Sequence, residues 1–201
     1  EGVGMIACDT SRTRAYLNAM IRHQMHPMYV LILENSETKS LPGQGHRVGW
    51  STLGHQLNRD HNDHCWSELD FAIDAPLRNM LELADIPYSI GPSEDINDPS
   101  LVAMISNRPE TVFIYSGFGG ALLHKKILSI GKRFLHVHGG HLPNYKGSTA
   151  NYFSLITEGK MGASAIFLSE EIDSGPILLR REFPAPEKRE HIDHIFDSAA
   201  R

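Results

Sequence analysis

The sequence predicts an α/β protein with a mainly parallel, twisted sheet flanked by helices. The chain opens with an apolar run at residues 5–8, an amphipathic stretch, and a second apolar run at residues 28–33. Continuous apolar runs are typical of strands buried on both faces, and strand–helix–strand order is typical of a doubly wound sheet. Residues 111–115 supply a further strand, because β-branched and aromatic side chains favour extended backbone.

The remaining elements follow in order. Residues 11–23 form the first expected helix, capped by Thr10 or Ser11. Residues 34–66 are polar and rich in glycine and histidine, which indicates an insertion or long loop and is compatible with a lid. A helix is expected from Ser67, kinked before Pro76, to about Asp85. The later expected elements are strands at 88–90, 133–138, 163–168 and 176–181, and helices at 99–106 (begun by Asp98), 122–130, from Ser148 or Thr149 to 158, and 187–201.

Length and composition favour one domain. The chain has 201 residues, of which 41% are hydrophobic and 21% charged, as in ordinary soluble globular proteins. No apolar run approaches the roughly 20 residues that span a bilayer, and the start lacks the basic and apolar regions of a secretion signal. We expect a single domain over residues 1–201, with a C-terminal extension beyond Arg201 left open.

Charge and cysteine content narrow the function classes. The net charge is −5 without a block of like charges, which argues against non-specific nucleic-acid binding. The two cysteines, Cys8 and Cys65, form no CxxC pair and no disulfide framework. A cytoplasmic compartment is therefore expected, with Cys8 buried in its apolar run.

The chemistry-bearing residues gather in two segments. His136 and His138 alternate on an expected strand, so both side chains point to one face, directly before a Gly- and Pro-rich turn. Asp173 lies 35 residues after His138, in a turn between two apolar runs. A carboxylate beside an imidazole orients the ring and supports its charged form, which is an acid/base arrangement.

Other interpretations of these residues remain open. His136, His138 and Asp173 also satisfy a two-histidine, one-carboxylate metal pattern, to which His141 and His124 could add ligands. A histidine on a strand can equally be a hydrogen-bonded core residue. In the 34–66 segment a cluster has ligand-like spacing, although a solvated loop explains it more simply: His55, His61, His64 and Cys65.

Both segments resemble the formyltransferase family, which includes glycinamide ribonucleotide, methionyl-tRNA and sugar-amine N-formyltransferases. The family pattern is Asn-x-His, a Leu-Pro loop with an aromatic, a basic residue and Gly, then Asp-x-Gly. The matching positions are His138, Leu142, Pro143, Tyr145, Lys146, Gly147, Asp173 and Gly175. The resemblance runs from about Met5 to the end of the chain, and departs from the family at His136, which stands where the family has its catalytic Asn.

The resemblance implies a Rossmann-like formyltransferase fold and N10-formyltetrahydrofolate as cosubstrate, with no metal. Formyl transfer to an amine needs a group that moves a proton and a donor for the developing oxyanion. By resemblance, His138 moves the proton, Asp173 orients it, and His136 takes the donor's place. The implied folate-binding residues are Ser116, Gly117, Phe118, Gly119, Gly120, Leu122, Ile172 and Ser174. The implied residues for the amine substrate are Asp9, Lys146, Gly147 and Asn151.

The sequence thus predicts an N-formyltransferase acting on a primary amine of a small molecule, such as an amino sugar, amino acid or peptide-like metabolite. Methionyl-tRNA is disfavoured by the lack of a basic surface and of room for an extra domain. Glycinamide ribonucleotide stays open but is weakened by His136 and by the unusual insertion. The expected partners are the amine and folate, without nucleic acid or membrane, and a homodimer is compatible. The alternatives are a formyltetrahydrofolate hydrolase using the same residues, and a metal-dependent or non-catalytic α/β protein.

Overall fold

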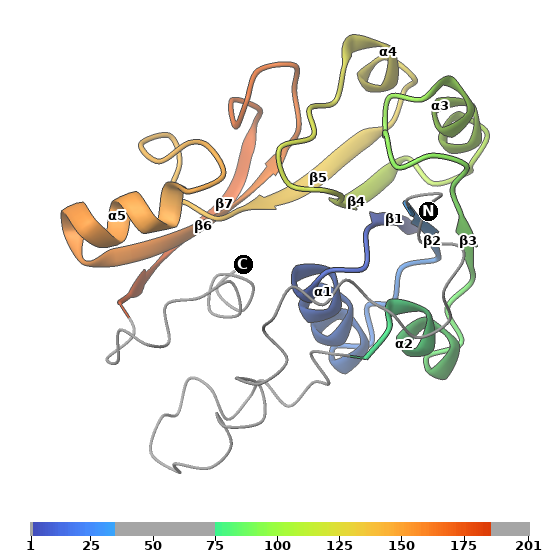
Figure 1. Ribbon diagram of the computed structural model, residues 1–201, viewed down its shortest axis with the longest axis horizontal. Helices are drawn as coiled ribbons and strands as arrows, with labels where there is room; N and C mark the ends of the chain where they lie inside the picture. Colours follow the sequence, from blue (N-terminus) through green and yellow to red (C-terminus); the bar gives the residue numbers. More distant parts are fainter. Residues whose placement is uncertain (1, 35–74, 186–201) are drawn as a thin grey trace.

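A computed structural model describes residues 2–34 and 75–185 as a seven-stranded sheet with helices on both faces (Figure 1). The elements, in chain order, are β1 (Val3–Ala7), α1 (Ser11–Arg22), β2 (Tyr29–Ile32), α2 (Leu77–Leu83), β3 (Tyr88–Ile90), α3 (Pro99–Ser106), β4 (Val112–Ser116), α4 (Lys125–Leu128), β5 (Arg133–His138), α5 (Ala150–Glu158), β6 (Lys160–Phe167) and β7 (Ile177–Pro184).

The strand order in the sheet is β3-β2-β1-β4-β5-β6-β7. The strands from β3 to β5 pair in parallel, whereas β6 runs antiparallel to β5 and β7 antiparallel to β6. The predicted α/β fold with a mainly parallel sheet is confirmed. Because β1, β4 and β5 are parallel, the loops that follow them leave the same edge of the sheet, where ligands bind in open α/β sheets.

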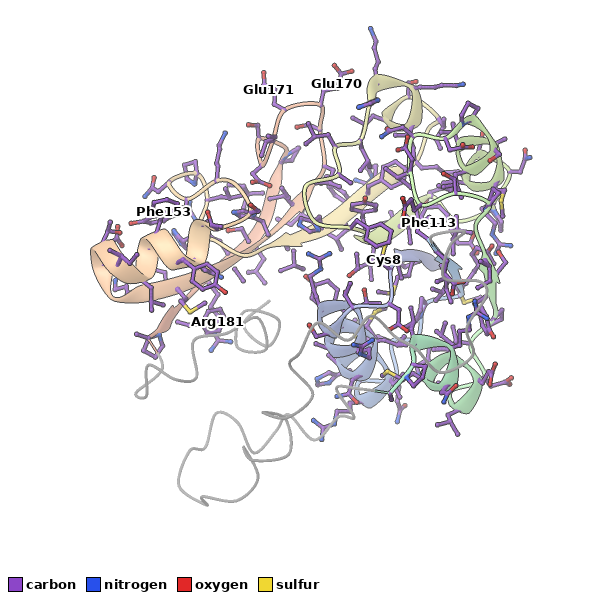
Figure 2. All side chains as sticks on the ribbon, in the orientation of Figure 1. Cys8, Phe113, Phe153, Glu170, Glu171 and Arg181 are labelled. Atoms are coloured by element: carbon purple, nitrogen blue, oxygen red, sulfur yellow. The ribbon has the colours of Figure 1, made fainter. Side chains whose placement is uncertain are left out.

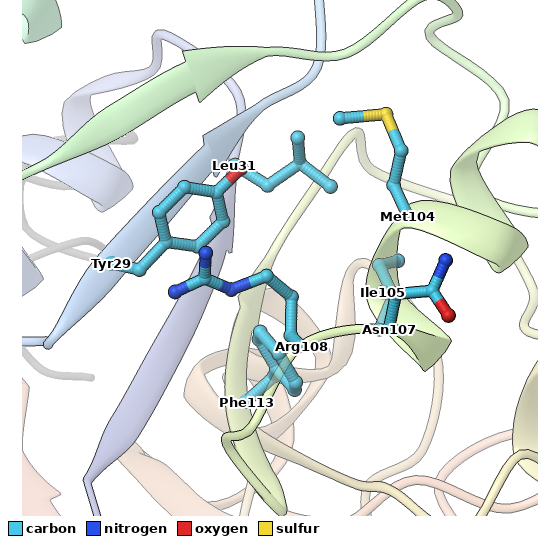
Figure 3. A pocket seen from close by; sticks show the side chains of 7 residues that line it. All are labelled: Tyr29, Leu31, Met104, Ile105, Asn107, Arg108 and Phe113. Carbon is cyan, nitrogen blue, oxygen red and sulfur yellow. The ribbon is translucent and has the colours of Figure 1, made fainter.

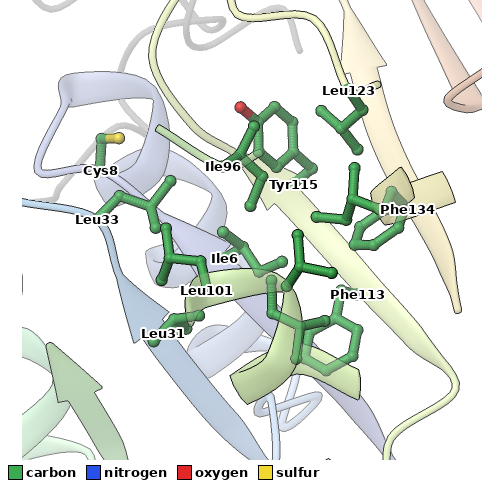
Figure 4. Packing of buried hydrophobic residues seen from close by; sticks show 13 residues of the cluster. Ile6, Cys8, Leu31, Leu33, Ile96, Leu101, Phe113, Tyr115, Leu123 and Phe134 are labelled. Carbon is green, nitrogen blue, oxygen red and sulfur yellow. The ribbon is translucent and has the colours of Figure 1, made fainter. Parts of the chain in front are cut away.

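The apolar core has two layers because each central strand is buried on both faces. Ile6, Leu31 and Phe113 pack beneath α3 and α4, in the layer of Figure 4. The alternate residues of the same strands, such as Met5 and Val30, pack against α1 and α2. This two-sided burial explains the uninterrupted apolar runs of the first two strands.

Two helices begin at the expected caps. The Thr10 side chain accepts a hydrogen bond from the Thr13 backbone N–H at 3.2 Å and caps α1. The Asp98 carboxylate accepts from the Ser100 N–H at 2.8 Å and caps α3. Both contacts satisfy backbone donors that a helix start leaves unpaired. In the described ranges no helix is long and apolar enough to cross a membrane.

Some boundaries differ from the prediction. The helix predicted over residues 122–130 spans only Lys125–Leu128. The Asn97 side chain donates to the Leu122 carbonyl at 2.9 Å and accepts from the His124 N–H at 2.7 Å, and these bonds hold residues 122–124 outside the helix. Strand β7 extends to Pro184, beyond the predicted end. The predicted segments at 35–66, 67–74 and 187–201 lie outside the described residues.

Candidate active site

Strand β5 places His136 and His138 on the face that carries Phe134. His136 lies beside Tyr115 of β4, with ring centroids 6.4 Å apart. Its Nδ1 is 3.0 Å from the Tyr115 carbonyl oxygen, which only accepts, so Nδ1 carries a proton in this hydrogen bond. In the neutral ring Nε2 is then an acceptor, and it donates only from the doubly protonated ring. His136 thus differs from an amide, which donates at any pH.

The loop after β5 fixes His138. Its Nε2 donates to the Tyr145 carbonyl at 2.7 Å, and the residue is only 5% exposed. Gly140 lies against this contact. A Cβ there would lie 2.7 Å from His138 Nε2 and 2.6 Å from the Tyr145 oxygen, closer than carbon atoms approach. Glycine at this position therefore allows the loop to close over the imidazole.

The same loop is attached to both strands of the β6–β7 hairpin. The Ser164 hydroxyl donates to the Gly140 carbonyl at 2.7 Å and accepts from the Leu142 N–H at 3.0 Å. Arg180 donates from Nη1 to the Leu142 carbonyl at 2.9 Å. Leu142 itself is fully buried, and the Leu142–Pro143 peptide is cis. These contacts hold the predicted Leu-Pro loop in one position relative to β5.

Asp173 reaches His138 because the loop between β6 and β7 folds back along β5. The Leu168 N–H donates to the Phe134 carbonyl near the start of β5, whereas Asp173 contacts His138 at the end of that strand. The Asp173 Oδ2 lies 3.4 Å from His138 Nδ1 and accepts a hydrogen bond from the Gly147 N–H at 2.8 Å. The predicted pairing of His138 with Asp173 agrees with this geometry.

The His138–Asp173 pair is well shielded from solvent, with side chains 6% and 11% exposed. Both ring nitrogens of His138 face oxygen atoms, Asp173 Oδ2 on one side and the Tyr145 carbonyl on the other. The Tyr145 carbonyl only accepts, so Nε2 carries a proton in its hydrogen bond, whereas the 3.4 Å contact of Nδ1 with Asp173 is an ion pair when the ring is charged. The carboxylate therefore lies beside the imidazole in a site where water screens their interaction weakly.

The Asp-x-Gly turn has a steric cause. Asp173 has a positive φ of 50°, and a Cβ on Gly175 would lie 1.8 Å from the Phe167 carbonyl oxygen. Only glycine lets the chain pass this carbonyl as it enters β7.

The loop between β6 and β7 also contacts the loop after β5. Glu170 and Glu171 lie at the outer tip of the β6–β7 loop (Figure 2), and the Lys146 ammonium donates to the Ser174 hydroxyl at 2.6 Å. The loop after β5 and the β6–β7 loop are thus joined by two hydrogen bonds, Lys146–Ser174 and Gly147–Asp173.

The Gly-rich loop after β4 is attached to α1. Ser116 is fully buried and shares a 2.8 Å hydrogen bond with the Thr13 hydroxyl. Arg12 donates from Nε to the Ser116 hydroxyl at 3.3 Å and from Nη2 to the Gly117 carbonyl. No role for Arg12 or Thr13 was expected from the sequence. Their position in the first turn after β1 was the available signal, because that turn reaches the ligand edge of such sheets.

Large apolar side chains stay exposed on the two predicted folate-binding loops. Phe118 is 40% exposed, Leu122 46% and Ile172 54%. Exposed apolar groups next to a polar cluster are typical of ligand-binding surfaces. This combination fits a flat, partly apolar ligand with polar edges.

Two side chains beneath the Gly-rich loop are buried and neutral. Cys8 is 1% exposed, and burial raises the pKa of its thiol to about 12. Burial also raises the pKa of the Tyr115 hydroxyl, which stays protonated at physiological pH. Neither group is therefore a ready nucleophile.

The residues predicted to bind the amine are distributed differently from the catalytic pair. Asp9 pairs with Arg14 and accepts from the Leu77 N–H at 3.2 Å, so it links β1 to the start of α2. Asn151 is 2% exposed, and its Oδ1 accepts from the Gly162 N–H at 2.8 Å. These are contacts within the fold, and substrate binding by both residues stays a prediction. Lys146 and Gly147 lie beside Asp173, as described above.

The alternative metal site would need His136, His138 and Asp173 together, and among these described residues the structure pairs only His138 with Asp173. Within residues 2–34 and 75–185, no three His, Cys, Asp or Glu side chains form a metal-binding group. The expected absence of a metal stays a prediction. The histidine-rich cluster at residues 55–65 lies outside the described part of the chain.

A cavity of about 320 Å³ lies far from these residues, at the edge of the sheet where the parallel strands begin (Figure 3). Its wall includes Tyr29 and Phe113, with the Arg108 guanidinium 3.7 Å from the centre of the Tyr29 ring. Arg108 forms a two-bond ion pair with the buried Glu110. The opposite edge nevertheless holds the candidate site, because the titratable residues and the shielded pair are there.

Comparison with known proteins agrees with this arrangement. The sequence profile of the family described as Formyl transferase matches residues 89–198, more than half of the chain. That range contains both histidines, Asp173 and the Gly-rich loop. The chain belongs to the formyl transferase family.

Its curated relatives are methionyl-tRNA formyltransferases. The methionyl-tRNA formyltransferase of Rhodopirellula baltica is 26% identical over 110 residues, which is 54% of this chain and 32% of that protein. The enzyme of that name from Thermodesulfovibrio yellowstonii is 37% identical over 65 residues, 31% of this chain and 21% of its own length. The matches thus span about a third or less of these curated relatives.

Two solved structures show the same fold. The phosphoribosylglycinamide formyltransferase of Anaplasma phagocytophilum superposes with a TM-score of 0.62 at 14% identity, covering 99% of this chain and 78% of that one. The phosphoribosylglycinamide formyltransferase of Bacillus halodurans gives a TM-score of 0.59 at 14% identity, covering 94% and 82%. The predicted Rossmann-like formyltransferase fold is confirmed.

Proposed function

We propose that this protein is an N-formyltransferase that moves a formyl group from N10-formyltetrahydrofolate to a primary amine of a small molecule. The observation that carries the proposal is the shielded His138–Asp173 pair, 3.4 Å apart and held by the Gly147 N–H. An imidazole–carboxylate pair beside a ligand surface is suited to moving a proton between two nitrogens. Membership in the formyl transferase family gives the pair a reaction to serve.

The pair acts as one unit in this proposal. Both nitrogens of His138 are engaged, so the imidazole exchanges a proton with a ligand only through Asp173 or after the Tyr145 carbonyl moves away. We therefore propose that the pair takes the proton of the attacking amine and returns a proton to N10 of the folate as the bond between the formyl carbon and N10 breaks. His136 donates to the oxyanion from Nε2 when its ring is doubly protonated.

The folate would be held by the Gly-rich loop and the hairpin loop. The exposed Phe118, Leu122 and Ile172 offer apolar contacts to a flat ring, and residues 116–120 offer backbone groups. Bound N10-formyltetrahydrofolate supplies the electrophilic formyl carbon. The Arg12 bond to the Gly117 carbonyl attaches the start of this loop to α1.

The acceptor in this proposal is a small amine, such as an amino sugar, amino acid or peptide-like metabolite. The net charge of −5, without a block of basic residues, supports a small molecule over a tRNA. Lys146, beside Asp173, supplies a positive charge for an anionic group on such an acceptor. The proposed compartment is the cytoplasm, where reduced cysteines such as Cys8 are ordinary.

The test combines binding with turnover. Saturating 5-formyltetrahydrofolate is expected to raise the melting temperature, because a ligand that binds only the native state stabilises it. Release of tetrahydrofolate from the 10-formyl compound should then depend on the added amine, measured over a panel of amino sugars, amino acids, peptides and methionyl-tRNA. Folate binding with amine-independent release would indicate a hydrolase. A protein stabilised by divalent metals and not by folates would refute the proposal.

A further inference from the structure

One buried polar atom in the candidate site, the Tyr115 hydroxyl oxygen, has no hydrogen-bond partner among the described residues. Tyr115 as a whole is 4% exposed. A buried hydroxyl without a partner is costly, because it has given up its bonds to water and gained none. Native proteins retain few such groups, and each one needs an explanation.

The position of the hydroxyl indicates what it serves. A Cβ on Gly117 would lie 2.3 Å from the Tyr115 oxygen, so the hydroxyl occupies the place of a side chain on the Gly-rich loop. Figure 4 shows it at the end of the core layer, near Ile96 and Leu123, pointing out of the packed side chains. The loop backbone at Gly117 is thus its immediate cover.

The covering loop is not packed as a core segment would be. Phe118 and Leu122, next along the chain, are 40% and 46% exposed, and a Cβ on Gly119 or Gly120 would meet no atom within 4 Å. Tyr115 also lies beside His136, with ring centroids 6.4 Å apart. The hydroxyl therefore lies between the predicted folate-binding loop and a predicted catalytic residue.

We infer that the Tyr115 hydroxyl is a recognition group that forms a hydrogen bond with the polar edge of the bound pterin when the loop at Gly117–Gly120 adjusts around the ligand. This rests on the proposed function, and it adds a specificity-determining residue to it. The hydroxyl stays protonated because burial raises its pKa, so it can donate to a ring nitrogen or carbonyl, and its oxygen can accept from an amino group. Ligand binding would then supply a partner that the described residues do not supply.

Replacing Tyr115 with Phe tests the inference, because it removes one oxygen and keeps the ring that packs in the core. The affinity for 5-formyltetrahydrofolate, measured by calorimetry, is expected to fall about threefold to tenfold, the range of one neutral hydrogen bond. The melting temperature without ligand should stay level or rise, since an unpaired hydroxyl is lost. This combination of weaker binding and undiminished stability is the signature of a group kept for a ligand.

Tyr29→Phe is the matched control. Its hydroxyl is hydrogen-bonded to Ser89 at the opposite edge of the sheet, so this change should leave folate affinity unaltered. A drop in ligand-free stability for Tyr115→Phe would mean that the hydroxyl has a partner in the free protein, and unchanged folate affinity would mean that the ligand does not use it. Either result would overturn the inference about Tyr115 and leave the proposed function standing. Absence of folate binding by the wild-type protein would instead overturn the proposed function.

Discussion

Removing the charge of Asp173 while keeping its shape tests the centre of the mechanism. In the wild-type protein the Gly147 N–H donates to the Asp173 carboxylate at 2.8 Å. In Asp173→Asn the amide oxygen can still accept this bond, but the ion pair with His138 is lost. A hydrogen bond to a charged group contributes about 1.5–3 kcal/mol and a neutral one about 0.5–1.5 kcal/mol. We therefore expect the free energy of unfolding to fall by about 1–2 kcal/mol.

Turnover should fall much further than stability. Loss of a positioned acid/base group costs about 10²–10⁴-fold in rate, and His138→Ala should show a similar loss because the two residues act as one unit. The assay is amine-dependent release of tetrahydrofolate, together with urea denaturation and folate affinity. Asp98→Asn is the control, with the same change in charge at the cap of α3, where asparagine caps as well as aspartate. Asp173→Asn with more than a tenth of wild-type kcat would refute the assigned role.

Three further results are expected. His136→Asn should keep substantial turnover and His136→Ala should lose about 10²–10³-fold in kcat; an Asn variant as inactive as His138→Ala would make His136 an acid/base in its own right. Gly175→Ala should lower the free energy of unfolding by about 1–3 kcal/mol, because its Cβ would overlap the Phe167 carbonyl 1.8 Å away; an unchanged urea midpoint would refute this. Burial raises the pKa of the Cys8 thiol from 9.0 to about 12, so the folded state binds more protons and stability should fall above about pH 9 by up to about 1.4 kcal/mol per pH unit. Cys8→Ala should remove that part of the slope, and equal slopes in both proteins would contradict the assignment.

The sequence was sufficient for most of the fold because its signals are local. The apolar runs that became β1 and β2 are buried on both faces, and Thr10 and Asp98 cap the helices where their side chains predicted. The helix predicted over residues 122–130 was too long for a non-local reason. Asn97, more than twenty residues away, takes the Leu122 and His124 backbone groups that the first turn needed.

Within the candidate site, too, the features set by local sequence were predicted, and those set by contacts between distant segments were not. Alternation along a strand predicts that His136 and His138 share a face, and the family pattern predicts that Asp173 joins them. Neither predicts that the Tyr145 carbonyl engages Nε2 of His138, since that contact depends on how the loop closes over Gly140. Arg12 and the hydroxyl of Tyr115 were missed for a similar reason, because their relation to the Gly-rich loop exists only in three dimensions.

Because the β6–β7 loop returns along β5, the two members of the His138–Asp173 pair are synthesised at different times. The parallel part of the sheet is complete at His138, but the carboxylate that balances this imidazole arrives 35 residues later, between the last two strands. A nascent chain that has made only β1 to β5 therefore has the histidines in place without their counter-charge. The pairing of β1 with β4 joins Val3 to Val112 and closes a longer loop, so Asp173 arrives late because of its position in the chain. Under the proposed function, a nascent chain that ends before Asp173 would lack the carboxylate of the pair and leave the formyl donor untouched.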